Sequence, residues 1–372
     1  MNEILSQKLI GYRIKALREQ HDLVQSDLST LMGFNDRQTL SDIENGKRNL
    51  KPEELLQLCV HLHTSLDELL DIFSVTGEAK FSWRASNSIA AEALDSFESH
   101  AGKWVGLLRW LRTTQKSKIS PLKHSLRLDA QSSYEDAIDR AENLADQLQL
   151  GSIPAKRLPS AIDSRLDIPV LFVDTIDAPN GSVSGAACHL QDLGIILVNR
   201  HESEARRFFT LAHELFHALT WDAMEPAHRE SNTKEARSKS KRIETLADNF
   251  AAALLMPTSA LDFVLSRDRL TDINHLVDAA KELRTSPSAL AWRLFNMKLI
   301  SEETRNALAS HSALPEISEQ PKRFSESFVE MLHQAIDSGR LSAKKAAKAL
   351  GFNLPGLAGL FDEYAMPVPF EM

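Results

Sequence analysis

The chain has 372 residues, enough for about two or three domains that each bury a hydrophobic core. Apolar residues make up 43% of it and charged residues 25%, which is typical of a globular protein and excludes a disordered or fibrous one. The formal net charge of −8 argues against non-specific nucleic-acid binding by the whole surface, although a single DNA-binding module depends on its local charge.

Cysteine usage and hydropathy indicate where the protein works. Cys59 and Cys188 lie far apart in the sequence, which predicts a reducing compartment and no disulfide framework. We expect both thiols to be buried, with a redox role as the alternative. The N-terminus does not resemble a signal peptide, and no run of about 18 apolar residues is present. We therefore expect a cytoplasmic protein that does not enter the membrane.

Short helices are expected at the start of the chain. Apolar residues follow helical spacing from Ile10 to Leu17. Further short helices are expected over residues 25–33, 37–45, 52–62 and 65–72. Gly33 and Asn45-Gly46 are typical of helix ends, so the region fits a compact helix-turn-helix domain.

Three motifs in this region carry a family resemblance. They are Arg13 to Arg18, Gln25 to Leu28, and Ile43 to Arg48, which contains Glu-Asn-Gly-Lys after the third helix. Residues 9–72 thereby resemble the XRE, or Cro/repressor, DNA-binding domains. The resemblance implies an all-α domain that binds double-stranded DNA at a specific operator.

The third helix is the expected recognition helix. Asn35 can cap it, and side chains near its start would meet base edges: Arg37, Gln38, Thr39 and Ser41. Arg37 could read guanine and Gln38 adenine. Candidate phosphate contacts flank the second and third helices: Gln25, Lys47 and Arg48.

Two further features bear on this domain. Arg18 and Glu44 are expected to form an internal ion pair, and Val24 stands where a capping Ser or Thr is commoner. Residues 1–52 hold eight basic and seven acidic residues, so we expect modest DNA affinity per chain and a homodimer across two half-sites. The alternative is a helical protein-interaction module.

Residues 75–128 are expected to form a helical connector that includes Trp83. Helical spacing relates Trp104, Leu107, Leu108 and Leu111. This stripe predicts a core face or a dimer interface, with ligand binding by the tryptophans as the alternative.

A helix and three strands are expected next. Ser132 to Leu150 is amphipathic, with Ala137, Ala141, Leu144 and Leu148 along one side. The strand candidates are Ile168–Val173, Ser182–His189 and Gly194–Asn199. They predict a small antiparallel sheet whose edge could hold an extended peptide.

The stretch Phe208 to Leu219 contains His-Glu-x-x-His. On a helix, His213 and His217 lie one turn apart on the same face, so both imidazoles can bind one metal ion. Glu214 beside them can act on a metal-bound water. This is the pattern of zinc peptidases. The alternative is an amphipathic helix with two histidines outside any metal site.

A second helix is expected over Glu244 to Pro257, rich in Ala and Leu and ended by proline. Glu244 and Asp248 share one of its faces. Glu244 can supply the third ligand that a catalytic zinc needs, and Asp248 can accept a hydrogen bond from the free nitrogen of a ligand histidine. The alternative is a solvated acidic face. Before this helix, the basic run Ser231 to Arg242 is either solvated or suited to an acidic partner.

Arg207 to Leu219 and Glu244 to Pro257 together resemble the ImmA/IrrE-type metallopeptidases, over about residues 130–300. The resemblance implies His213, His217 and Glu244 as Zn²⁺ ligands and Glu214 as the catalytic acid/base. It also implies an α+β zincin-like fold in which the helix at 132–150 backs the metal helix.

The rest of the chain is expected to be helical. Leu276 to Leu299 reads as two helices, the second capped by Ser286 or Ser288. His311 to Lys322 reads as a linker, and Phe324 to Phe361 as a helical hairpin for packing or oligomerisation, with a second helix-turn-helix as the alternative.

These elements predict a mainly α fold with a small antiparallel β-sheet. The expected parts are a helix-turn-helix domain at 1–74, a helical connector at 75–128, a zincin-like metallopeptidase domain at 129–310, and a linker with a helical tail at 311–372.

The predicted function is a DNA-binding transcription regulator with a zinc-dependent endopeptidase. Peptidase members of the family that it resembles cleave XRE-type repressors, which implies a repressor or antitoxin-type protein as substrate in a stress or mobile-element response. The alternatives are a non-proteolytic regulator that senses a ligand or metal, and a toxin–antitoxin component that uses the fold for binding. Glu214 favours the enzyme, because a sensor need not keep it.

Overall fold

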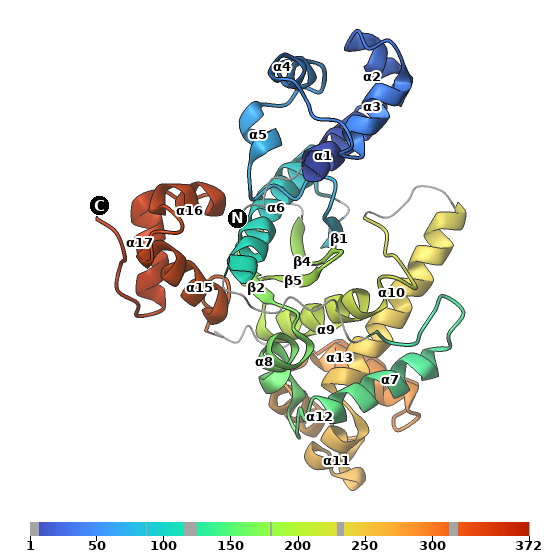
Figure 1. The fold of residues 1–372 in the computed structure, drawn as a ribbon. Helices are drawn as coiled ribbons and strands as arrows, with labels where there is room; N and C mark the ends of the chain where they lie inside the picture. Colours follow the sequence, from blue (N-terminus) through green and yellow to red (C-terminus); the bar gives the residue numbers. More distant parts are fainter. Residues whose placement is uncertain are drawn as a thin grey trace. The chain divides into compact units, whose positions relative to one another are not determined.

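In the computed structural model, the described residues are 7–86, 88–114, 125–178, 181–228, 234–311 and 319–371 (Figure 1). The chain divides into two compact units. The first holds residues 1–80, 95–119 and 327–372, and the second holds residues 81–94 and 120–326. The predicted domain limits are not decided by this division and stay predictions.

The helix-turn-helix region forms five short helices. They are α1 (Gln7–Gln20), α2 (Gln25–Leu31), α3 (Arg37–Glu44), α4 (Pro52–His61) and α5 (Leu66–Leu70). Ile14, Leu40 and Leu58 belong to their shared core. A Cβ on Gly11 would come within 2.4 Å of the carbonyl oxygen of Ile43, so glycine lets α1 approach the end of α3.

The cap of α3 differs from the prediction. Asp36, not Asn35, is the N-cap, and its carboxylate accepts a hydrogen bond from the Thr39 amide at 2.8 Å. A capping side chain reaches the amide three residues on, and α3 begins at Arg37, so only the residue at 36 is placed to cap it. Val24, which stands where a capping Ser or Thr is commoner, is the N-cap of α2 and makes no hydrogen bond with its side chain.

The remaining helices of the first unit come from α6 (Ala91–Thr114) and the C-terminal region. The latter forms α15 (Glu326–Asp337), α16 (Ala343–Leu350) and α17 (Leu354–Glu363). The predicted stripe of α6 from Trp104 to Leu111 is buried core. The Trp104 indole N–H donates to the carbonyl oxygen of Leu350 at 3.4 Å, so the C-terminal helices pack within this unit.

The second unit is built from helices around one sheet. Its helices are α7 (Tyr134–Gln147), α8 (Pro154–Leu166), α9 (Glu204–Thr220), α10 (Lys234–Leu255), α11 (Thr258–Val264), α12 (Ile273–Glu282), α13 (Pro287–Asn296) and α14 (Glu302–Ala309), with a 3₁₀ turn at Arg267–Arg269. Ser286, one of the two candidates that the sequence offered, caps α13, and Ser133 caps α7. Helix α7 packs along α10, the helix that carries Glu244 (Figure 1).

The strands are β1 (Lys80–Ala85), β2 (Val170–Val173), β3 (Asp177–Ala178), β4 (Gly181–Leu190) and β5 (Leu193–Asn199). The sheet order is β1-β4-β5-β2, and β3 pairs with β4. The sequence predicted an antiparallel sheet, but the sheet is mixed. Strands β4 and β5 form an antiparallel hairpin, and β2 pairs in parallel with the other side of β5. Strand β2 comes before the β4–β5 hairpin in the chain and runs in the same direction as β5. The β2–β5 pair is therefore parallel.

Strand β1 was not predicted, because residues 75–128 were expected to be helical. Apolar Phe81 and Trp83 alternate in the sequence with polar Ser82 and Arg84, and the two rings stack with their centres 5.2 Å apart. This period of two is the signal that marks a strand.

Helix α9 lies between the sheet and α10, so it is buried along most of its length (Figure 1). A Cβ on Gly185 of β4 would come within 2.7 Å of the Thr210 methyl group, so glycine allows the close approach of sheet and helix.

The fold class is confirmed: the chain is mainly α with a small sheet in its second unit. Cys59 and Cys188 are buried, as expected, and neither is in a disulfide; burial raises the pKa of Cys59. Among the described residues, no helix is long and apolar enough to cross a membrane.

Candidate metal centre and candidate DNA-binding surface

Helices α9 and α10 bring three potential ligands together. The Nε2 atoms of His213 and His217 lie 3.1 Å apart, and an oxygen of Glu244 lies 3.0 Å from Nε2 of His213. The candidate ligand atoms of the three residues all fall within 4.8 Å of one another. Two imidazoles and a carboxylate are the donor set of many catalytic zinc sites. Their roles as metal ligands stay predictions.

Asp248 orients one of these imidazoles. Its Oδ1 lies 2.9 Å from Nδ1 of His213, the nitrogen that faces away from His217 and Glu244. This is the contact predicted from the spacing of Glu244 and Asp248 on one helix face. An N–H donated from Nδ1 to Asp248 leaves Nε2 with a free lone pair for a metal ion.

The charges at this site favour a cation. Burial lowers the pKa of His213, but hydrogen bonds to Asp248 and Glu244 outweigh it and raise that pKa to about 9. Burial alone would raise the pKa of Glu244, but its hydrogen bonds to the two histidines hold that pKa well below its usual range. The carboxylates therefore stabilise a proton on His213, and a metal ion would have to displace that proton from Nε2 in order to bind.

Glu214 provides the test of whether these residues fit a metal. Its side chain is fully buried, and neither carboxylate oxygen has a hydrogen-bond partner in the described part of the chain. Burial raises the pKa of Glu214 above its ordinary value. A buried carboxylate is costly unless something binds it. Beside three converging ligand atoms, such a carboxylate fits a site that holds Zn²⁺ and a reacting water.

The candidate metal centre is open to solvent on the α10 side. His213 and His217 are buried, whereas the side chains of Glu244 and Asp248 are 41% and 52% exposed. These two carboxylates are therefore the part of the candidate site that faces solvent.

Arg84 of β1 is a site residue that the sequence did not reveal. Its Nη1 atom lies 3.8 Å from Oδ1 of Asp248, and its guanidinium lies 5.3 Å from the centre of the Phe209 ring. The alternation in β1 could have indicated a strand, but nothing local placed that strand near α10.

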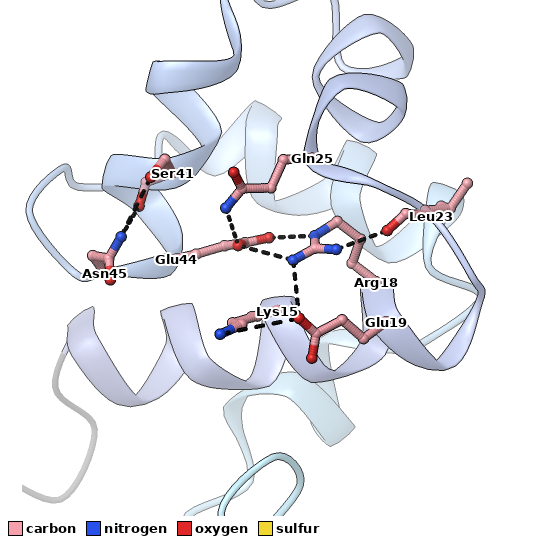
Figure 2. A network of polar contacts seen from close by, with 8 residues as sticks. All are labelled: Lys15, Arg18, Glu19, Leu23, Gln25, Ser41, Glu44 and Asn45. Carbon is pink, nitrogen blue, oxygen red and sulfur yellow. Dashed lines mark hydrogen bonds and ion pairs between the residues drawn. The ribbon is translucent and has the colours of Figure 1, made fainter.

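The predicted ion pair in the helix-turn-helix domain is confirmed. Figure 2 shows Arg18 donating from Nε to a Glu44 oxygen at 2.6 Å and from Nη1 to the Leu23 carbonyl oxygen at 2.7 Å. Gln25 joins this network, because its amide donates to the second oxygen of Glu44 at 2.8 Å. Gln25 therefore helps to hold α2 against α3, and its predicted phosphate contact remains untested.

The candidate base-reading side chains lie at the start of α3, where Arg37 and Gln38 are exposed. Gln38 donates to Asp42 at 2.9 Å, and the Thr39 hydroxyl donates to Asp36 at 3.0 Å. Figure 2 shows Ser41 accepting from Asn45 through its carbonyl oxygen, at 2.7 Å. Contact with bases stays a prediction for all four candidates.

The two candidate phosphate ligands after α3 differ. Lys47 is exposed. Arg48 makes a two-pronged contact with Glu54, at 2.7 and 2.9 Å, and lies over the Phe34 ring. Arg48 thus fixes the loop after α3 to α4, and a phosphate would have to compete with Glu54 for it.

The basic run before Glu244 is described only in part. Residues 229–233 and the side chains of 234–239 lie outside the described residues. Arg242 donates to the carbonyl oxygens of Ala130 and Ser132, each at 2.7 Å, and lies over the Tyr134 ring. Arg242 therefore anchors the start of α7.

Comparison with known families addresses both units. Residues 14–69 match the helix-turn-helix family model, and residues 164–295 match the model of the IrrE N-terminal-like domain, peptidase family M78. The chain joins a helix-turn-helix domain to an IrrE N-terminal-like domain. Both stand in the predicted order, and the second match includes the whole candidate metal centre.

Individual proteins add less. No curated protein matches the chain. Among solved structures, a Mycobacterium tuberculosis transcriptional regulator is 18% identical, with a TM-score of 0.32. The match covers 50% of this chain and 51% of that one, so it spans about half of each.

Proposed function

We propose that the chain is a transcription regulator whose IrrE N-terminal-like domain is a zinc-dependent endopeptidase. The observation that carries this proposal is the convergence of His213, His217 and Glu244 beside the buried Glu214. A helix-turn-helix domain in the same chain makes it a DNA-binding regulator with a peptidase-family domain.

The chemistry follows from the four side chains. His213, His217 and Glu244 would hold Zn²⁺, which when bound acidifies a water and polarises a peptide carbonyl. Glu214 accepts a proton from the attacking water and passes it to the leaving amine. Its raised pKa brings the carboxyl closer to the pH at which it must both take and release a proton. Asp248 keeps the imidazole of His213 in the required orientation.

The proposed substrate is another regulatory protein, either an XRE-type repressor or an antitoxin-type protein. Support comes from the resemblance to ImmA/IrrE-type peptidases and from the DNA-binding domain in the same chain. Cleavage would remove the substrate in a stress or mobile-element response.

On DNA, we propose that two copies of the chain bind two half-sites. The start of α3 would lie in the major groove with four side chains toward the bases: Arg37, Gln38, Thr39 and Ser41. Phosphates would be held by Gln25, Lys47 and Arg48. The exposure of Arg37, Gln38 and Lys47 supports this assignment.

A non-proteolytic regulator that senses a ligand or metal is the second candidate. A pocket of about 980 Å³ beside the metal centre favours it, because the pocket is large enough for an effector. Glu214 favours the enzyme, because a sensor gains nothing from a buried carboxylate that is not a predicted ligand.

Metal analysis of the purified chain, followed by incubation with candidate repressors, separates the two. The peptidase predicts bound zinc and discrete cleavage products that disappear after chelation and return with zinc. Zinc-loaded protein that leaves every candidate intact would favour the sensor.

A further inference from the structure

A large pocket lies in the second unit, walled by α7, α9, α10, α13 and the side chain of Arg84. Its volume is about 980 Å³. The pocket is contiguous with the metal centre: Asp248 lines it and contacts His213, and Thr210 lines it one turn before His213 on α9. A chain bound at the metal centre could therefore extend a side chain into this pocket.

One end of the pocket carries hydrogen-bonding groups that lack partners. The Nη1 atom of Arg84 is buried without a hydrogen-bond partner among the described residues, and its 3.8 Å separation from Asp248 exceeds hydrogen-bond length. The hydroxyl of Thr210 is also buried and without such a partner in this part of the structure. Both groups can donate, and buried donors left unmatched are costly.

The other charged groups in the wall are already paired or exposed. Arg206 donates to Glu202 at 2.9 Å, and Arg293 pairs with Glu142. Glu135 is exposed in the first turn of α7. Asp248 directs its Oδ1 to His213. Arg84 is therefore the cation of this wall whose hydrogen bonding is least satisfied by its neighbours.

The remaining wall is partly apolar. Ile138, Phe209, Ala252 and Trp292 line it, and Phe209 lies under the Arg84 guanidinium. An apolar wall strengthens a charge-assisted hydrogen bond by lowering the local dielectric. The ligand that matches is a carboxylate on an aliphatic stem. The volume also leaves room for residues on either side of that group.

We propose that this pocket is a subsite for an acidic side chain of the protein substrate, with the carboxylate seated on Arg84 and Thr210. The inference rests on the proposed function and adds the substrate class: a polypeptide with Asp or Glu near the scissile bond. Cleavage would then select for an acidic residue at one fixed position.

Binding is measured first, on full-length, zinc-loaded Glu214→Gln, which should not turn over peptide. The probes are the acetylated, amidated pentapeptide Ala-Ala-Glu-Ala-Ala, its twin with Gln in the centre, and free glutarate. We expect the Glu peptide to bind about tenfold more tightly than the Gln twin, as one charge-assisted hydrogen bond provides. Equal binding of the two peptides would overturn the proposal.

Variants in the same background test Arg84. Arg84→Gln should lower the affinity for the Glu peptide to that for the Gln twin. Arg84→Lys should restore part of the preference for the Glu peptide. Arg267→Gln, an exposed arginine outside the pocket wall, is the matched control and should change neither peptide. A purely structural Arg84 would weaken both peptides alike, which would contradict the subsite, as would a preference that survives Arg84→Gln.

Two further measurements are needed. The first identifies the source of the carboxylate, and the second separates failure of the subsite from failure of the peptidase function. Glutarate that binds as tightly as the Glu peptide would replace the substrate with a free carboxylate effector and overturn the substrate assignment. In a peptide-library digest, the wild-type chain should enrich Asp and Glu at one position, and Arg84→Gln should lose that enrichment. Cleavage without acidic enrichment contradicts the subsite alone, whereas absent cleavage with intact Glu-over-Gln binding contradicts the peptidase function alone.

Discussion

The Nδ1 atom of His213 on α9 lies 2.9 Å from a carboxylate oxygen of Asp248 on α10. The two residues are 35 positions apart in the sequence, and their contact joins α9 to α10. It also leaves Nε2 of His213 facing His217 and Glu244. The hydrogen bond therefore holds the imidazole in the orientation that the proposed metal site requires.

Asp248→Asn should weaken zinc binding without removing a ligand. The amide keeps the shape but loses the negative charge that supports the His213 N–H, so we expect affinity to fall by about 10- to 100-fold. Competition with a chromophoric chelator measures the change. Asp262→Asn, on an exposed ion pair of α11, is the control and should leave the affinity as it is. An Asp248→Asn protein with wild-type affinity would show that the contact does not tune the site.

Glu244→Ala should remove a zinc ligand. The wild-type chain is expected to hold about one zinc ion, because three protein ligands and an open position define such a site. Elemental analysis of purified protein should show markedly lower occupancy in the variant, with Glu282→Ala of α12, an exposed acid, as control. Unchanged stoichiometry and affinity in Glu244→Ala would exclude Glu244 from the ligand set.

The buried pair of Arg18 and Glu44 should stabilise the helix-turn-helix domain. Glu44→Ala leaves the buried guanidinium of Arg18 without its carboxylate, which costs about 3–5 kcal/mol. Glu19→Ala removes the exposed partner of the same arginine and should cost about 0–1 kcal/mol. Hydrogen exchange of residues 7–70 in the full-length chain reports both. Equal protection in the two variants would mean that the buried pair contributes little.

DNA recognition should separate base contacts from phosphate contacts. On an operator selected from random sequence, Gln38→Ala should relax the sequence preference at a cost of about 1–3 kcal/mol. Lys47→Ala should weaken all sequences alike and flatten the dependence of affinity on salt. Binding curves at several salt concentrations distinguish the two. If selection and footprinting yield no site, residues 1–74 are better explained as a protein-interaction module.

Local patterns predicted the parts of the site that a single helix fixes. His213 and His217 had to share a face because four residues make about one helical turn. The ion pair of Arg18 with Glu44 was also foreseen, on the motifs that resemble XRE domains. The spacing of Glu244 and Asp248 placed both on one face of α10, but the distance of that face from His213 depends on how α10 packs on α9.

The features that the sequence did not predict depend on tertiary packing or lie at the end of a helix. Arg84 reaches Asp248 only because β1 joins β4, a pairing between segments about a hundred residues apart. The parallel pairing of β2 with β5 has the same cause, since short apolar strands do not encode their direction. The cap at Asp36 was missed by one residue, within the usual uncertainty of a helix boundary.

Glu214→Gln tests the proposed peptidase most directly. The amide keeps the size of the buried side chain and removes the base, so zinc binding, folding and DNA binding should persist while hydrolysis is lost. The measurement compares wild type and Glu214→Gln in one reporter strain under the inducing signal, with immunoblots of candidate repressors. We predict that the wild type loses the repressor and induces the reporter, whereas the variant retains the repressor and fails to induce. Identical induction and identical repressor levels in the two strains would contradict proteolysis and leave a sensor.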